Sequence, residues 1–269
     1  MKEIRRMQME RYLSEVGYAT IQQLCEKFEI HPNTARSDIK ELIERGVAEK
    51  KYGGVGYTST KLPEGYYEQR RETNKKSKES IGYKALALLE EGDIIFVDGG
   101  TTTSLLFEFI SEMPKHLVII TNNLDVINKA FLNSDFTIYI LPGKGNRELN
   151  SFVSTETIDS LKSYNVNKAF IGAKGISTKG DLSSMSTIDV KLKKTAIEIS
   201  QTVILMADSQ KLNNSGIVNF SSLDKVDYWV CDKNKEEICE LARKQNVKLV
   251  AVSYNHIPAN ETCDTIVYR

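Results

Sequence analysis

The sequence lacks the features of a secreted, membrane-spanning or polycationic protein. Its 36 basic and 36 acidic residues cancel, so any argument for nucleic-acid binding must rest on local geometry. No apolar run approaches the roughly 18 residues that a membrane-spanning helix needs. The first residues are charged throughout and contain no apolar signal-peptide core. We therefore expect a cytoplasmic protein without a membrane partner.

Cysteine and histidine are also scarce. The four cysteines are scattered and form no CxxC pair, which is typical of reduced core residues in a cytosolic protein. The three histidines have no ligand-like partner at metal-binding spacing. The GxxxxGK[ST] phosphate loop is absent, so nothing supports nucleotide hydrolysis. We predict no metal site and no cofactor.

The N-terminal residues instead carry the pattern of three short helices. Apolar residues at helical spacing give the first helix one buried face, and Gly17 ends it. Thr20, with Gln23 three positions on, forms a capping-box pattern for the second helix. Pro32 suits the first position of the third helix, because its missing N–H needs no partner there. The buried stripe of this third helix is expected at Ala35, Ile39, Leu42 and Ile43.

The opposite face of the third helix carries hydrogen-bonding and cationic side chains that can contact bases and phosphates. Arg36 is the candidate base contact and Lys40 a candidate phosphate contact. A short hairpin follows, closed by a glycine pair. Together these elements predict a winged helix-turn-helix. The second helix of that motif fits the major groove of double-stranded DNA. The candidate DNA-binding residues are Asn33, Thr34, Arg36, Ser37, Lys40, Lys50, Lys51, Tyr52, Gly53 and Gly54. An ordinary three-helix bundle with a solvated polar face is the alternative.

This region resembles the DeoR family of bacterial transcription regulators. The similarity rests on HPNTARSDI (31–39), followed by Leu42, Gly46 and the YGG of the hairpin. Two residues depart from the family pattern. His31 stands where a capping serine is usual, which we expect to weaken the helix start. Ser37 replaces the second of two arginines, so operator preference is expected to differ from that of typical members.

The chain length predicts about two domains at roughly 100–200 residues each. We expect the DNA-binding domain at residues 1–57 and a polar, solvated linker at 58–80. Residues 81–269 are expected to form a sensing and oligomerisation domain. In it, a helix at 81–90 is followed by apolar strands that alternate with helices, which favours a mostly parallel α/β sheet covered on both faces. The expected strands are residues 94–97, 117–120, 137–141, 168–171, 203–206, 228–230 and 248–252.

Glycine, hydroxyl and lysine side chains follow several of these strands directly. Ligands of open α/β sheets bind at the carboxyl ends of the strands, and small residues before a helix start suit an oxyanion such as phosphate. We therefore predict a site for an anionic metabolite, although any one of these loops alone would be an ordinary strand-to-helix turn. The candidate residues in these loops are Asp98, Gly99, Gly100, Thr101, Thr102, Thr103, Thr121, Asn122, Asn123, Gly143, Lys144, Gly172, Lys174, Asp208 and Lys211.

This half of the chain also resembles the DeoR sensor domain. The similarity rests on DGGTTT (98–103), TNN (121–123), AFIGAKGIS (169–177), ADSQK (207–211) and the Val190-Lys191 pair, which adds Lys191 to the candidates. The resemblance implies a fold related to ribose-5-phosphate isomerase and a phosphorylated sugar or related metabolite as effector. Lys174 stands where the family often has an acid. If the lysine side chain faces the pocket, it favours a more anionic ligand. If the side chain lies on the surface, the replacement says nothing about the ligand.

The sequence favours binding over catalysis. A sugar-phosphate isomerase needs a carboxylate base beside the substrate, but the loop after residue 171 has none. Asp98 and Asp208 are the remaining acids, and orienting loops is the preferred role for both. We expect a homo-oligomeric repressor, at least a dimer, of a carbohydrate-metabolism operon. An isomerase-like enzyme and a DNA-binding scaffold without a ligand are the alternatives.

Overall fold

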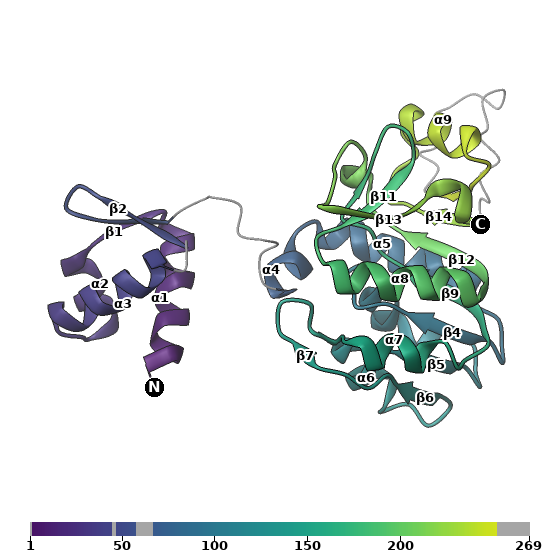
Figure 1. Ribbon diagram of the computed structural model, residues 1–269, viewed down its shortest axis with the longest axis horizontal. Coiled ribbons are helices and arrows are strands. Elements are labelled where there is room, and N and C mark those ends of the chain that lie inside the picture. The colour runs from purple at the N-terminus through teal and green to yellow at the C-terminus, as the bar shows by residue number, and fades with distance from the viewer. Residues whose placement is uncertain (1, 45–46, 58–66, 252–269) are drawn as a thin grey trace. The chain divides into compact units, whose positions relative to one another are not determined.

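The computed structural model describes residues 2–44, 47–57 and 67–251. The chain divides into two compact units, Met1–Glu64 and Gly65–Arg269, and each is described by itself (Figure 1). Among the helices of these described ranges, none is both long enough and apolar enough to cross a bilayer.

The smaller unit is a winged helix-turn-helix. Its helices are α1 (Lys2–Val16), α2 (Ile21–Phe28) and α3 (Pro32–Glu44), and its strands are β1 (Tyr18–Thr20), β2 (Ala48–Lys51) and β3 (Gly54–Tyr57). The strands form an antiparallel sheet in the order β1-β3-β2. The sequence did not predict β1, because three residues are too few to show a strand period and the pairing partner lies far along the chain.

Local sequence signals set the boundaries of these helices. Gly17 has a φ of +73°, and its N–H donates to the Leu13 carbonyl as α1 ends. The expected capping box at the start of α2 is present, since the Gln23 N–H donates to Thr20 Oγ1 and the Thr20 N–H donates to Gln23 Oε1. Apolar residues from all three helices and the sheet form one core around Met9 and Leu42.

The larger unit is built on a parallel sheet of seven strands in the order β15-β14-β12-β9-β4-β5-β6. These strands are β4 (Ile94–Val97), β5 (Val118–Thr121), β6 (Thr137–Ile140), β9 (Val166–Ile171), β12 (Ser200–Met206), β14 (Tyr228–Val230) and β15 (Lys248–Val250). Each predicted strand lies in this sheet, so the parallel α/β prediction is confirmed. Residue 252 of the last predicted strand falls outside the described residues.

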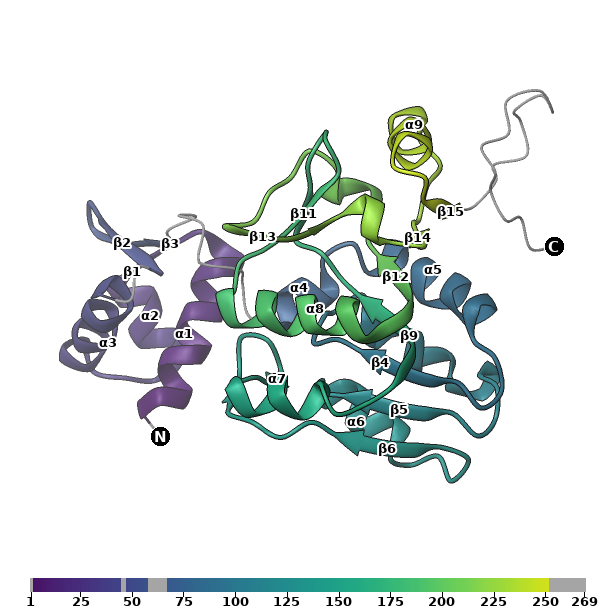
Figure 2. The same cartoon turned by 45° about the vertical axis from the view of Figure 1, so that its right-hand side comes forward.

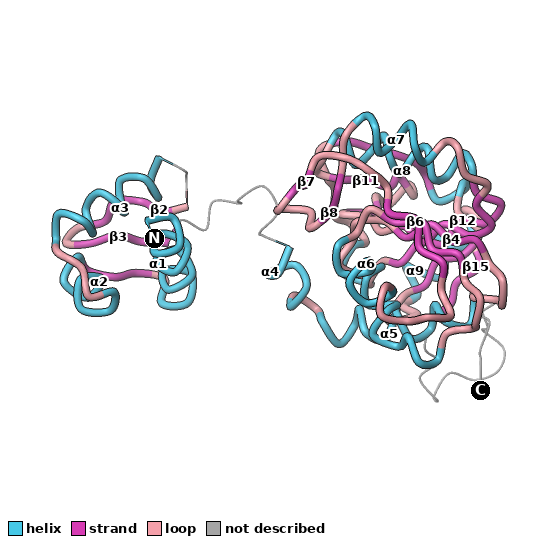
Figure 3. Tube along the Cα trace, turned by 90° about the horizontal axis from the view of Figure 1, so that it is seen from below, coloured by secondary structure: helices cyan, strands magenta, loops and turns pink. Residues whose placement is uncertain are grey.

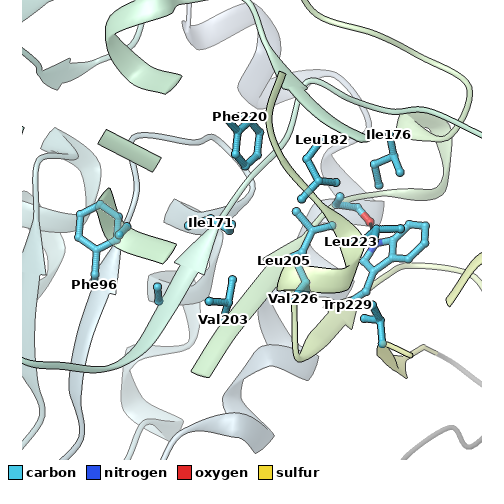
Figure 4. Close-up of a cluster of buried hydrophobic side chains, with 14 of the residues drawn as sticks. Phe96, Ile171, Ile176, Leu182, Val203, Leu205, Phe220, Leu223, Val226 and Trp229 are labelled. Atoms are coloured by element: carbon cyan, nitrogen blue, oxygen red, sulfur yellow. Dashed lines mark hydrogen bonds between the residues drawn. The ribbon is translucent and has the colours of Figure 1, made fainter. Parts of the chain in front are cut away.

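Helices cover both faces of this sheet. On one face lie α5 (Lys75–Ala85), the 3-10 segment η2 (Thr103–Glu112) and α6 (Leu124–Ala130). The other face is covered by α7 (Thr155–Leu161), α8 (Thr187–Ile199) and α9 (Glu236–Lys244). Figure 3 shows α5 and α6 on the side opposite to α7 and α8. The buried Trp229 lies in the second of these layers, in one apolar cluster with Leu205 and Phe96 (Figure 4).

Smaller elements were not predicted from the sequence. A second, antiparallel sheet contains β10 (Gly175–Ile176), β11 (Asp181–Ser184) and β13 (Val218–Ser222), and the last two lie beside α8 (Figure 2). A separate hairpin pairs β7 (Gly145–Asn146) with β8 (Ser151–Phe152), and each of these strands has only two residues. The 3-10 turns are η1 (Leu86–Leu88), η3 (Ser209–Lys211) and η4 (Leu223–Lys225).

The segment expected to be a solvated linker differs from that expectation. Residues 58–66 lie outside the described residues, but α4 (Tyr67–Glu72) and α5 belong to the larger unit. Tyr67 is 2% exposed and Lys78 is 3% exposed. The expected helix at 81–90 therefore begins earlier, at Lys75, and its α-helical part ends at Ala85. A polar run does not reveal from sequence which of its long side chains are buried.

Candidate nucleic-acid interface and candidate effector site

The polar face of α3 is presented to solvent. Asn33, Arg36, Ser37 and Lys40 are exposed and Thr34 is half-buried. The opposite side of the helix is buried at Ala35, Asp38 and Leu42, whereas Ile39 and Ile43 are only partly buried. The Arg36 guanidinium donates to Asn33 Oδ1 at 3.2 Å, which holds both side chains on the same exposed turn. This face has hydrogen-bond donors and two cations where base edges and phosphates can be contacted.

His31 does not leave the start of α3 without a cap. The Asn33 N–H donates to His31 Nδ1 at 3.3 Å, and the Thr34 N–H donates to the His31 carbonyl at 2.9 Å. The imidazole therefore accepts the hydrogen bond that a serine hydroxyl would accept at this position. The expected weakening of the helix start is thus offset by the ring nitrogen.

Asp38, which sequence reasoning missed, fixes α3 against α1. Its carboxylate is fully buried and accepts hydrogen bonds from Arg5 Nε at 2.7 Å and Arg6 Nε at 3.0 Å. The signal was the position of Asp38 within the apolar stripe, opposite two adjacent arginines near the N-terminus. These arginines hold the orientation of the exposed face.

The hairpin residues Lys50, Lys51, Tyr52 and Gly53 are also exposed, and Gly54 is half-buried. Gly53 has a φ of +76°, which favours glycine in this turn. A Cβ on Gly54 would lie 2.3 Å from the Ala19 carbonyl oxygen, so the second glycine permits the close pairing of β3 with β1. Both glycines therefore have structural roles. The two lysines supply the positive charge of the wing, and Lys51 Nζ lies 3.2 Å from Glu49 Oε1.

In the larger unit, the order in which the chain adds strands reverses between the parallel neighbours β4 and β9. The chain continues from β4 to β5 and β6 on one side, and later returns to β9 on the other. The crevice at the carboxyl ends of two such strands is where open α/β sheets bind ligands. The loop after β4 begins with Asp98, and the loop after β9 begins with Gly172.

Asp98 joins these two loops. Its buried carboxylate accepts hydrogen bonds from the N–H groups of Gly100 and Gly172, both at 2.8 Å, and from Thr103 Oγ1 at 2.8 Å. Lys193 Nζ forms an ion pair with the same carboxylate. This set of partners makes Asp98 the residue that holds the two loops together.

The cation beside Asp98 is Lys193, two positions after the candidate Lys191. Lys191 is exposed, whereas Lys193 is 5% exposed. Residues two apart on a helix point about 200° apart, so only one of them faces inward. Asp189, one turn earlier, lies 3.7 Å from Lys193 Nζ and accepts from Ser184 Oγ.

In the loop after β5, Thr121 and Asn123 bond to neighbouring segments, whereas Asn122 has a side-chain acceptor without a partner in the described ranges. Thr121 Oγ1 donates to the Val97 carbonyl, and Asn123 caps α6 through its side-chain oxygen while donating to the Asp98 carbonyl. Asn122 Nδ2 donates to the Phe152 carbonyl at 2.8 Å, but its Oδ1 is buried without a hydrogen-bond partner. Asn122 is therefore the member of this loop with an acceptor available to a ligand.

The loop after β12 presents a second such acceptor. Asp208 is fully buried, and its Oδ1 accepts from the Gln210 N–H while its Oδ2 has no hydrogen-bond partner. Ser209 donates its N–H to Asp232 Oδ1 at 2.7 Å. Burial acts to raise the pKa of Asp232, but hydrogen bonds from Ser209 and Ser77 outweigh it and lower the pKa. Lys211 is half-buried at the end of the loop.

The turn between β4 and η2 contains the remaining predicted hydroxyls. Gly99, Thr101, Thr102 and Thr103 are buried and Gly100 is half-buried. Lys78, a residue that the sequence placed in the solvated linker, donates to Thr101 Oγ1 at 3.1 Å. Burial, together with the positive charge of Lys211, lowers the pKa of Lys78 to about 8.

Three predicted residues contribute less to this arrangement. Lys144 is exposed, and a Cβ on Gly143 would lie 2.2 Å from Thr157 Oγ1, so this glycine permits the packing of α7. Lys174 is half-buried, and its N–H donates to the Ser183 carbonyl at 2.8 Å within the loop leading to the small sheet. Across the part of the chain that the structure describes, no group of three or more metal-binding side chains occurs.

Family models match both units of the chain. The model described as DeoR-like helix-turn-helix domain matches residues 5–61, and the DeoR C terminal sensor domain matches residues 73–233. The HTH-type transcriptional regulator IolR of Bacillus subtilis (strain 168) is 32% identical over 84% of this chain and 89% of that protein. The glycerol-3-phosphate regulon repressor of Escherichia coli (strain K12) is 28% identical over 80% of this chain and 84% of that protein.

Solved structures give a weaker similarity. Ribose 5-phosphate isomerase A from Methanocaldococcus jannaschii matches with 17% identity and a TM-score of 0.37, over 52% of this chain and 55% of that one. The chain therefore spans about half of that enzyme.

Proposed function

Because the chain belongs to the DeoR family of transcription regulators, we propose that it represses a carbohydrate-metabolism operon under the control of a phosphorylated metabolite. The observation that carries this proposal is the polar face of α3. It is exposed in a unit whose helices and wing have the arrangement of a major-groove reader. We expect Arg36 to contact base edges and Lys40 to contact phosphates.

The crevice of the larger unit supports a phosphorylated polyol as effector. Asn122 Oδ1 and Asp208 Oδ2 are buried acceptors without partners, and hydroxyl groups are the donors that satisfy such atoms. Lys78 donates to Thr101, and the charge of Lys211 acts on Lys78, so this pair of cations suits an anionic group. One of the relatives is named for a glycerol 3-phosphate regulon, which agrees with this chemical class.

Binding without turnover is the proposed role of this crevice. The Asp98 carboxylate is engaged by two backbone N–H groups, a hydroxyl and Lys193. A general base needs an available carboxylate within reach of the substrate carbon. Asp98 thus supports the loops. Asp208, whose Oδ2 has no hydrogen-bond partner among the residues described, is the other acid in the predicted loops. Turnover of a sugar phosphate by the purified protein, lost in Asp208→Asn, would overturn the proposal of binding without turnover.

A homodimer, or a larger assembly, is part of the proposal. Two linked reading units on neighbouring half-sites gain effective concentration that one small unit lacks. The exposed apolar residues Phe131 and Leu132 after α6, with Tyr139 and Ile140 on the edge strand β6, support burial against a second copy.

The DNA-binding proposal is tested with DNA selected from a random duplex pool by the wild-type protein. We expect Arg36→Ala to lose roughly 1–3 kcal/mol of sequence discrimination, about 5- to 150-fold in affinity, because one base contact is removed. Fluorescence anisotropy against selected and scrambled DNA measures this loss. Lys244→Ala, which removes an exposed charge from the larger unit, serves as the control. Equal binding of selected DNA by Arg36→Ala would refute the role of α3.

The effector proposal is tested by thermal unfolding in the presence of phosphorylated and unphosphorylated sugars. We expect stabilisation by at least one phosphorylated compound and a smaller shift in Lys211→Ala. A protein that no such compound stabilises would instead match the ligand-free scaffold.

A further inference from the structure

Three cations lie near one another beside the turn after β4, and two of them come from outside the predicted loops. Lys78 lies on α5, Arg70 on α4 and Lys211 at the end of the loop after β12. The charges of Arg70 and Lys211 both act on the ammonium of Lys78, together with the acids Asp208 and Glu72. Buried positive charge in excess of its partners favours an anion.

Within the described part of the chain, Arg70 and Lys78 each have a hydrogen-bond donor without an acceptor. Arg70 Nη2 donates to the Glu148 carbonyl at 2.8 Å, while Arg70 Nε is buried without a partner. Lys78 Nζ donates to Thr101 Oγ1 and to the Arg70 carbonyl. An ammonium carries three N–H donors, so these two bonds leave one. An oxyanion supplies acceptors for both the ammonium and the guanidinium.

We propose, building on the proposed function, that the anionic group of the effector binds Lys78, Arg70 Nε and Lys211 against the Thr101–Thr102 turn, and that α4 thereby senses occupancy. Lys78 joins the ligand site to α4, because one of its bonds goes to the turn after β4 and the other to the main chain of α4. An anion on the remaining N–H therefore acts on the same ammonium that donates to the Arg70 carbonyl.

Helix α4 is placed to report such a change. It begins at Tyr67, close to the boundary between the two units at residues 64 and 65. The Tyr67 hydroxyl shares hydrogen bonds with Ser104 Oγ and Asp125 Oδ2, both at 3.0 Å. Arg71 forms ion pairs with Glu108 and Asp125. The helix is thus held by contacts to α6 and to η2, the segment that directly follows the turn that receives the anion.

The binding step is tested by titrating the full-length protein with inorganic phosphate. The chain has one tryptophan, Trp229, whose indole N–H donates to the Ala207 carbonyl at the start of the Lys211 loop. Its fluorescence therefore reports on that loop. We expect saturable binding that weakens at least tenfold in Lys78→Met and remains unchanged in Lys76→Met, an exposed lysine on the same helix.

Lys78→Arg, which retains the charge, is expected to bind phosphate more tightly than Lys78→Met. Arg70→Gln provides an independent variant and carries the test if Lys78→Met does not fold. Unchanged phosphate affinity in Lys78→Met overturns the proposal. If only Arg70→Gln folds, unchanged affinity in that variant overturns it instead. The absence of saturable phosphate binding by the wild type also overturns it. Binding of selected DNA by the ligand-free protein tests the proposed function separately.

The coupling step is tested by amide hydrogen exchange of residues 67–72 with and without phosphate. We expect a several-fold change of exchange rate in the wild type and none in Lys78→Met at the same phosphate concentration. Exchange in α4 that is insensitive to bound phosphate overturns the role of α4 as the sensor of occupancy.

Discussion

At the residue scale, each unit contains a buried carboxylate that orients the groups around it. Asp38 holds α3 through Arg5 and Arg6, and Asp98 holds the loops after β4 and β9. A buried carboxylate is stable only with such partners, and removing one side of the pair leaves an uncompensated charge. Neither carboxylate needs to touch DNA or ligand to determine the geometry of its site.

Asp38→Asn is expected to destabilise the smaller unit by about 3 kcal/mol, because two guanidinium groups lose their buried carboxylate. Urea unfolding followed by circular dichroism measures the loss. The only tryptophan lies in the larger unit, so its fluorescence transition should not move. Glu44→Gln, which removes an exposed partner of Lys40, is the control. An unchanged dichroism transition in Asp38→Asn would contradict this account.

Phosphate binding is expected to depend on the protonation of Lys78. Burial lowers the pKa of Lys78 to about 8 in the presence of Arg70, Glu72, Asp208 and Lys211. A bound anion favours the charged form and raises that pKa. Affinity should therefore fall above pH 8, by up to roughly tenfold per pH unit.

Fluorescence titration with inorganic phosphate between pH 7 and pH 9.5 measures this dependence. Lys78→Arg should flatten it, because a guanidinium stays protonated throughout this range. The same steep fall in Lys78→Arg would assign the proton to another group.

At the scale of elements, the close packing of α5 on η2 positions the turn that carries the threonines. Gly82 lies in this contact, where a Cβ would be 2.7 Å from the Leu105 carbonyl oxygen and 2.8 Å from its carbon. These are main-chain atoms, so the contact is not relieved by rotating a side chain. The glycine permits an approach that sets where Lys78 meets Thr101.

Gly82→Ala is expected to destabilise the larger unit by about 1–2 kcal/mol, because overpacking outweighs the better helix propensity of alanine. The urea midpoint of Trp229 fluorescence measures this effect. Gly145→Ala is a matched control, since its Cβ would meet only Phe152 Cε1 at 4.0 Å. Equal midpoints for the two variants would show that α5 can move away without cost.

At the scale of the whole molecule, the edge strand β6 is unusual for a parallel sheet. Such sheets are normally covered on both faces, but Tyr139 is 45% exposed and Ile140 is 47% exposed. Phe131 and Leu132, in the connection from α6, add further exposed apolar side chains. This edge is where we expect the second copy of the chain.

Leu132→Glu is expected to shift the assembly towards monomer and to weaken binding to two-half-site DNA, because a charge would be buried in the contact. Sedimentation velocity measures the mass, and anisotropy measures the DNA affinity. Ile217→Glu alters another exposed apolar residue, on the loop before β13, and should change neither. A dimer that persists in Leu132→Glu would place the contact elsewhere.

Much of this protein was determined by the sequence itself. The seven parallel strands were predictable because each is a short apolar run between turn residues. Gly17 and Pro32 act through their own backbone geometry, and Thr20 acts through hydrogen bonds with Gln23, three positions on. The helix boundaries they mark therefore needed no tertiary information.

The tertiary structure decided which polar residues are inside. Lys78 and Lys193 sit among other lysines in the sequence, and only packing shows that they are buried while Lys191 is exposed. The partners of Asp98 lie up to 95 positions away along the chain. Burial and pairing of charge depend on contacts between distant segments, and local periodicity has no access to these contacts.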